Sequence, residues 1–161
     1  MKNKNEATKG FHRLAAFMTY YHMIAGLLGL MITFLLLRKL PIPSDTWVLF
    51  FIQTILFCLV FYCGYAFMNK DYKRGIILSI FINVLQVIPF NIDGIGFEFI
   101  GGVSASLKYF FAPSSFGAME FSLPDFNLAE AVASSEYFGV NFVALLILIG
   151  LFRMLSGLKK S

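Results

Sequence analysis

Four residues of this sequence have side chains that could do chemistry from within or beside apolar segments: His22, Cys58, Cys63 and Asp93. An ionisable side chain inside an apolar run, such as His22, often marks a metal, haem or proton site. The other histidine, His12, would lie about 15 Å away along one helix, so the two rings cannot bind one ion. A hydrogen bond from His22 to a neighbouring helix is the simpler interpretation.

The cysteines and Asp93 each lack a second reactive group. Cys58 and Cys63 do not form a C-x-x-C motif and would lie on different faces of a helix, which is typical of buried thiols. Asp93 has no second acidic motif, although carboxylate acid–base chemistry usually needs a pair. We therefore expect a protein that is not an enzyme and has no catalytic residue, cofactor or metal. A membrane-embedded enzyme that uses His22 or Asp93 stays open as an alternative.

Small and polar side chains recur at helical spacing within the apolar runs. In the first run they are three or four residues apart and share one helix face, where small residues let helix backbones approach closely. Later runs contribute amides, which usually form hydrogen bonds between helices. We predict a helix-packing or partner interface made of nine residues: Thr19, His22, Gly26, Gly29, Thr33, Gln53, Asn83, Gln86 and Asn141.

The elements that would position these side chains follow from composition. Hydrophobic residues make up 58% of the 161 residues and charged residues 14%, with a mean hydropathy of +0.76. A soluble domain has about 25% charged residues, so a soluble or disordered protein is excluded. Four runs approach the roughly 20 apolar residues that span a bilayer: 14–37, 46–68, 75–92 and 137–155. We predict an all-α fold, a four-helix transmembrane bundle that forms one domain over 1–161.

The basic residues predict the orientation of the chain. Ten of the 13 lie before residue 14, between residues 70 and 74, or after residue 152. The positive-inside rule then puts both termini in the cytoplasm of a multi-pass protein, which we assign to the bacterial inner (plasma) membrane. Residues 93–136 would form an extracytoplasmic insert. No basic face for nucleic acid is visible, so the expected partners are the lipid bilayer and other membrane subunits, and a homo-oligomer stays open.

The insert changes from helical periodicity to alternation with a period of two, with Ile100 as the exception. Apolar residues at odd positions from Ile95 to Tyr109 alternate with Glu98, Ser104, Ser106 and Lys108, as in a half-buried strand. We predict a small β-hairpin of 96–111 with 118–123, followed by a helix that begins near Leu128 behind the capping-box spacing of Asn127–Glu130. An isolated hairpin is marginal in water. Its apolar face would dock on a partner: Phe97, Phe99, Val103, Leu107, Tyr109, Met119 and Phe121.

These features favour a non-catalytic structural or accessory subunit of a larger membrane complex, which docks through its helix seams and the external hairpin. A self-assembling channel or passive carrier stays open, with Asn83, Gln86 and Asn141 near its pathway, because rings of such side chains line some pores. No Asp, Glu, Lys or Arg lies at the centre of any run, and this absence argues against a coupled transporter.

Overall fold

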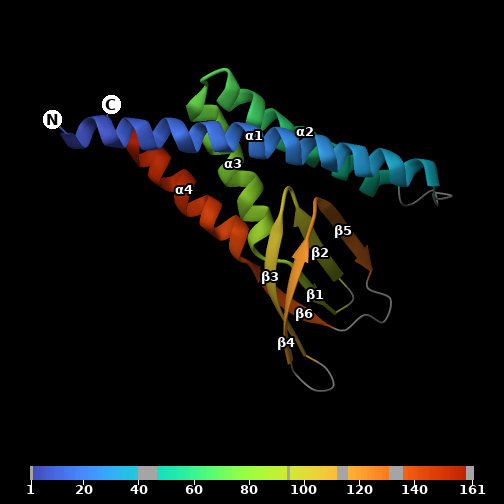
Figure 1. The fold of residues 1–161 in the computed structure, drawn as a ribbon. Coiled ribbons are helices and arrows are strands. Elements are labelled where there is room, and N and C mark those ends of the chain that lie inside the picture. The colour runs from blue at the N-terminus through green and yellow to red at the C-terminus, as the bar shows by residue number, and fades with distance from the viewer. Residues whose placement is uncertain (1, 40–46, 94, 112–115, 131–135, 159–161) are drawn as a thin grey trace.

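The computed structural model describes residues 2–39, 47–93, 95–111, 116–130 and 136–158, and these form four helices and one six-stranded antiparallel sheet (Figure 1). In chain order the elements are α1 (Lys2–Lys39), α2 (Trp47–Met68), α3 (Tyr72–Val87), β1 (Phe90–Ile92), β2 (Ile95–Ile100), β3 (Ser104–Phe110), β4 (Phe116–Ser122), β5 (Asp125–Glu130), β6 (Tyr137–Asn141) and α4 (Phe142–Leu158). The prediction of an all-α bundle with one small hairpin is therefore wrong.

Only α1, over Lys9–Arg38, and α2 are long and apolar enough to cross a membrane among the helices of the described ranges. Helices α3 and α4 have 16 and 17 residues, short of the roughly 20 that a bilayer core requires. A four-helix transmembrane bundle does not fit, because the third and fourth predicted spans each included residues that form a strand.

A proline ends the third helix, and an asparagine begins the fourth. Helix α3 ends at Val87, because Pro89 disfavours helical geometry at Ile88, which has φ −123° and ψ 87°. Phe90–Ile92 then forms β1 instead of the last turn of a span. At the other end, the Asn141 side-chain oxygen accepts hydrogen bonds from the backbone N–H groups of Val143 (3.1 Å) and Ala144 (3.3 Å). This N-cap starts α4 after strand β6.

Among the residues that the structure describes, the region predicted as a hairpin and a helix start contains four strands, β2 to β5, and no helix. Strand β3 does pair with β4, with Leu107 opposite Met119. Strand β2, however, pairs with β1 and β5. The predicted helix start at Asn127–Glu130 is therefore part of β5. Pairing with β5 satisfies backbone N–H and C=O groups of β2, which would have no partner if Asn127–Glu130 began a helix.

The strand order is β4-β3-β6-β1-β2-β5, and this order makes the sheet curl. Strands β4 and β5 lie at opposite ends of the order, yet only Leu123 and Pro124 separate them in the chain. That link reaches at most about 11 Å. In a flat sheet β3 and β2 would be about 14 Å apart, but the Lys108 Nζ of β3 lies 2.8 Å from the Glu98 carboxylate of β2. The sheet is therefore strongly curled, with β4 and β5 as its two edges among the described strands.

Glycines allow α1 and α2 to pack backbone against backbone. A Cβ added to Gly26 would lie 2.5 Å from the backbone nitrogen of Phe61, and one added to Gly64 would lie 2.7 Å from the carbonyl oxygen of Thr19. An apolar cluster around Phe57, Val60 and Phe99 attaches β2 to the helices. The sheet extends away from the ends of α3 and α4, and the first part of α1 and the last turns of α4 lie together at the opposite end (Figure 1).

The turn between α2 and α3 is a Schellman motif. The backbone N–H of Lys70 donates to the carbonyl of Phe67 and that of Asp71 to the carbonyl of Ala66, both at 3.0 Å. Lys70 therefore has φ 62°, at a position where glycine is the ordinary residue. A left-handed conformation costs a lysine about 1 kcal/mol relative to glycine.

Candidate functional site

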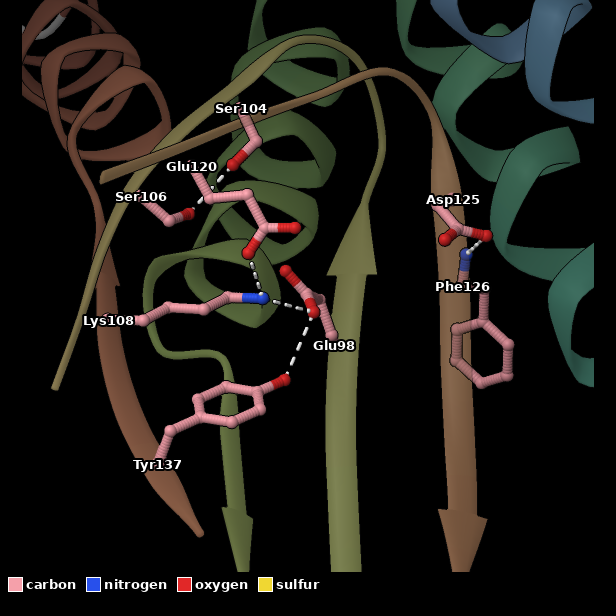
Figure 2. A network of polar contacts seen from close by, with 8 residues as sticks. All are labelled: Glu98, Ser104, Ser106, Lys108, Glu120, Asp125, Phe126 and Tyr137. Atoms are coloured by element: carbon pink, nitrogen blue, oxygen red, sulfur yellow. Dashed lines mark hydrogen bonds and ion pairs between the residues drawn. The ribbon is translucent and has the colours of Figure 1, made fainter. Parts of the chain in front are cut away.

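A network of charged and hydroxyl groups fills the concave side of the curled sheet (Figure 2). The Lys108 Nζ donates to Glu98 Oε2 and lies 2.8 Å from Glu120 Oε2 as well. The Tyr137 hydroxyl donates to the same Glu98 oxygen at 3.1 Å, and the Lys108 ammonium lies 4.6 Å from the centre of the Tyr137 ring. Four strands thus contribute to one ion-pair network.

Strand alternation explains why this network is inside. Ser104, Ser106 and Lys108 of β3 have exposed fractions of 1%, 2% and 5%, whereas Leu107 and Tyr109 are about half exposed. The concave face of the sheet is polar and its convex face apolar. A sheet packed in water has the opposite arrangement, since its polar face would meet solvent.

The electrostatics of the network favour the charged lysine. Burial alone would lower the pKa of Lys108. Its hydrogen bonds to Glu120 and Glu98 raise the pKa by more than burial lowers it, so the pKa of Lys108 is above the ordinary value of 10.5. Burial, and then the charge of Glu98, raise the pKa of Tyr137 above 10.0. Both shifts mean that Lys108 and Tyr137 hold their protons more tightly in the folded protein than in the unfolded chain.

We expect the free energy of unfolding to fall as the pH rises past about 10.5. A group whose pKa is raised by folding stabilises the folded state fully below its unfolded pKa, and this contribution is lost as pH rises through the folded pKa. Thermal unfolding in detergent between about pH 9 and pH 12 measures the effect. Lys108→Met should give a shallower dependence, and equal slopes for both proteins would contradict the assignment.

The convex side carries an exposed apolar surface, here called the outer face: Val103, Leu107, Tyr109, Met119 and Phe121. Their exposed fractions lie between 48% and 72%, with Phe121 the most exposed. The other two residues of the predicted docking set lie elsewhere. Phe99 is buried with its ring 5.7 Å from that of Phe57, and Phe97 packs against the same helix cluster. The convex face is thus divided between the helices and the outer face.

The outer face includes a free sheet edge. Strand β4 ends the strand order and pairs with β3 only, among the strands that the structure describes. Every second backbone N–H and C=O of an edge strand points away from the sheet and can pair with another chain. Met119 and Phe121 therefore belong both to an apolar surface and to a strand that lacks a second neighbour.

The nine residues predicted to pack helices are all buried, but most of their hydrogen bonds are local. The Thr19 and Thr33 hydroxyls and the Asn83 amide each donate to a carbonyl one turn earlier in their own helix. Gln86 makes a contact between elements, because its Oε1 accepts from the N–H of Gly101 at 2.8 Å. Asn141 caps α4 at the junction with the sheet.

Gly26 and Gly29 contact α2, at Phe61 and Phe57 respectively. The His22 Nδ1 donates a hydrogen bond to the Met18 carbonyl oxygen at 2.9 Å. The His22 Nε2, the Gln53 amide nitrogen and the Asn83 amide oxygen have no hydrogen-bond partner within the described part of the chain. The helix seams are thus held by glycine contacts and apolar packing more than by amide bridges.

The remaining reactive residues are separate from one another. Asp93 is exposed in the β1–β2 turn, where its backbone N–H donates to Glu136 at 3.4 Å, whereas His22 contacts Met18 and Phe67 in the helices. Cys63 is buried and Cys58 exposed, and both are free thiols. The residues that the structure describes contain no group of three His, Cys, Asp or Glu side chains arranged to hold a metal.

Comparison of the chain with protein-family models, with curated proteins and with solved structures gave no match. Function must therefore be argued from the geometry. The ion-pair network is the feature that sequence reasoning missed. The available signal is the alternation of Ser104, Ser106 and Lys108 with apolar neighbours, which indicates a half-buried strand but not which of its faces is enclosed.

Proposed function

We propose that this protein is a non-catalytic subunit of a larger membrane complex, which it joins through the outer face and the free edge of β4. The main observation behind this proposal is that Met119 and Phe121, on an edge strand, are 60% and 72% exposed. The partner is a protein that adds a strand beside β4, a mode in which backbone hydrogen bonds give affinity and alternate side chains give specificity.

The depth of the sheet supports a partner within the membrane. The turn after β2 reaches the middle of the spans: a Cβ on Gly101 would lie 3.1 Å from Val60 Cγ2, and one on Gly102 would meet the Tyr21 hydroxyl. Val60 is about 12 Å along α2 from its end at Met68. If α1 and α2 cross the bilayer, strands that start at this turn begin inside the hydrocarbon core, which is about 30 Å thick.

An unpaired strand edge at that depth needs a protein neighbour. Lipid chains offer no hydrogen bonds, and each unsatisfied backbone group costs several kcal/mol in hydrocarbon. The apolar outer face is compatible with lipid, but the backbone of β4 is not. A strand from another subunit satisfies both requirements, and so supports the docking proposal over simple exposure to lipid.

The distribution of charge supports the orientation that we propose, with both termini in the cytoplasm of a bacterial inner membrane. Segments 9–13 and 70–74 meet at one end, where the Phe11 and Tyr72 rings are 5.1 Å apart. The groove beside Lys70 and Lys73 is also lined by Leu155 and Leu158 of α4. These two segments hold five of the 13 basic residues, and cytoplasmic loops carry an excess of such residues.

We expect a photoreactive p-benzoylphenylalanine at position 121 to crosslink to a distinct second protein in native membranes. The matched control is the same residue at position 146, because Leu146 is 68% exposed on α4 and is expected to face lipid. The adducts are separated by mass and identified by mass spectrometry. A discrete protein adduct at position 121 alone is the expected result.

Equal labelling at the two positions, or labelling of lipid at both, would contradict docking through β4. An adduct with the mass of two copies of this chain would instead favour the self-assembled channel. The geometry gives that channel less support, because Asn83, Gln86 and Asn141 are buried within the chain and so do not present a polar lining on its surface.

A further inference from the structure

A groove of about 540 Å³ lies at the end of the molecule opposite the sheet, between the α2–α3 turn and the end of α4. Its lining is Lys70, Asp71, Tyr72, Lys73, Leu155 and Leu158. One wall is therefore cationic and the other aliphatic. We propose that this groove binds an anionic phospholipid, with the headgroup phosphate between Lys70 and Lys73 and an acyl chain along Leu155 and Leu158.

The charge of the groove is positive in spite of Asp71. That carboxylate is already engaged, because its Oδ1 accepts from the backbone N–H of Arg74 and its Oδ2 lies 3.3 Å from the Arg74 guanidinium. Lys70 and Lys73 form no ion pair with any residue that the structure describes. Two lysines without a carboxylate partner beside an apolar wall are complementary to a lipid with a negative headgroup.

The backbone holds one of these lysines in an unusual place. Lys70 has φ 62° at the end of the Schellman turn, where glycine would be free of strain. From this position its side chain lines the groove and also a neighbouring hollow of about 200 Å³ beside His12 and Tyr20 of α1. A lysine at a position where the backbone favours glycine is consistent with a role for its side chain.

The aliphatic wall selects a lipid rather than a soluble phosphate. Leu155 and Leu158 lie in the last turn of α4, whose exposed side chains nearer the sheet are apolar. Basic pockets at the cytoplasmic ends of membrane helices bind acidic headgroups in this way. The inference rests on the membrane placement proposed above but not on the β4 partner, so the two can fail separately.

The test measures lipid binding to the purified full chain. Native mass spectrometry, or fluorescence quenching by labelled lipid, compares phosphatidylglycerol with phosphatidylcholine at low and high salt. We expect the full chain to prefer phosphatidylglycerol at least tenfold, with the preference falling as salt rises. Inorganic phosphate alone is the probe for a soluble anion and should not displace the lipid at equal concentration.

The variants are Lys70→Gly and Lys73→Gln, with Lys9→Gln as a matched control, because Lys9 is exposed and lines neither hollow. Lys70→Gly relieves the backbone at φ 62°, so a loss of binding would not reflect misfolding. We expect the two groove variants to reduce the preference to near onefold and Lys9→Gln to preserve it. Retained preference in both groove variants, no preference in the unaltered protein, or displacement by inorganic phosphate would overturn the proposal.

Discussion

Lys108→Met should lower the free energy of unfolding by about 3 kcal/mol, the lower end of the range for removing one partner of a buried ion pair. The lysine side chain is 6% exposed and the Glu98 side chain 16%, so the substitution leaves a nearly buried carboxylate without its counter-ion. The value is not higher because Glu98 keeps the hydrogen bond from Tyr137. Equilibrium unfolding in mixed micelles, followed by the fluorescence of Trp47, measures the loss.

Two further variants separate charge from packing. Glu120→Gln should cost less than about 1 kcal/mol, because the Glu120 side chain is 51% exposed and solvent screens its ion pair. The double variant Glu98→Gln with Lys108→Met should recover much of the loss, since it removes both buried charges together. If Lys108→Met and Glu120→Gln cost the same, the network does not carry the stability assigned to it.

Gly26→Ala should destabilise the protein by about 2 kcal/mol, although alanine is the better helix former. The new Cβ would lie 2.5 Å from the nitrogen and 2.7 Å from the Cα of Phe61. Both are backbone atoms, so no side-chain rotation can relieve the contact, and α1 and α2 must separate. Thermal unfolding of the variant in the same detergent gives the shift.

Gly10→Ala is the control for this effect. It lies on the same helix, and a Cβ there meets nothing within 4 Å. Without a clash, alanine should stabilise α1 by about 0.5–1 kcal/mol through helix propensity. The two substitutions are chemically identical and are expected to have opposite signs. A destabilising Gly10→Ala, or a neutral Gly26→Ala, would show that backbone contact between the helices is not what limits stability.

The sequence allowed prediction of the parts of the fold that local patterns encode. The first two apolar runs, 14–37 and 46–68, coincide with the two helices that are long and apolar enough to cross a membrane. Alternation from Ile95 to Tyr109 predicted a strand, and β3, which lies mostly within that range, does pair with β4. The small-residue stripe of α1 predicted close approach, which Gly26 and Gly29 make to α2.

The rest of the sheet depends on contacts that no local window contains. Strands β1 and β6 pair with each other across more than 40 residues of chain, and both are short apolar stretches that continue a helical run without a change of periodicity. Apolar runs of this length fit strand and helix equally well. Only Pro89 and Asn141 mark the boundaries, and each is also tolerated near the end of a membrane helix.

The candidate site was missed for a related reason. The sequence places Glu98, Lys108, Glu120 and Tyr137 on segments that a single hairpin cannot bring together. The curl of the sheet brings them within hydrogen-bonding distance, and that curl follows from a strand order that alternation does not reveal. The apolar residues of β3 and β4 could be placed on one face from the sequence, because that placement needs only the local pairing.

The position of β6 also determines when the sheet can form during biosynthesis. This strand is the last in the chain but lies between β3 and β1 in the sheet. A ribosome therefore releases β1 to β5 as two separate groups, β4–β3 and β1–β2–β5, which cannot be joined until β6 emerges. Because β6 runs directly into α4, closure of the sheet must accompany packing of the final helix against α1 and α3. Until that moment the growing chain exposes strand edges of both groups, the period when a nascent protein is most open to mispairing.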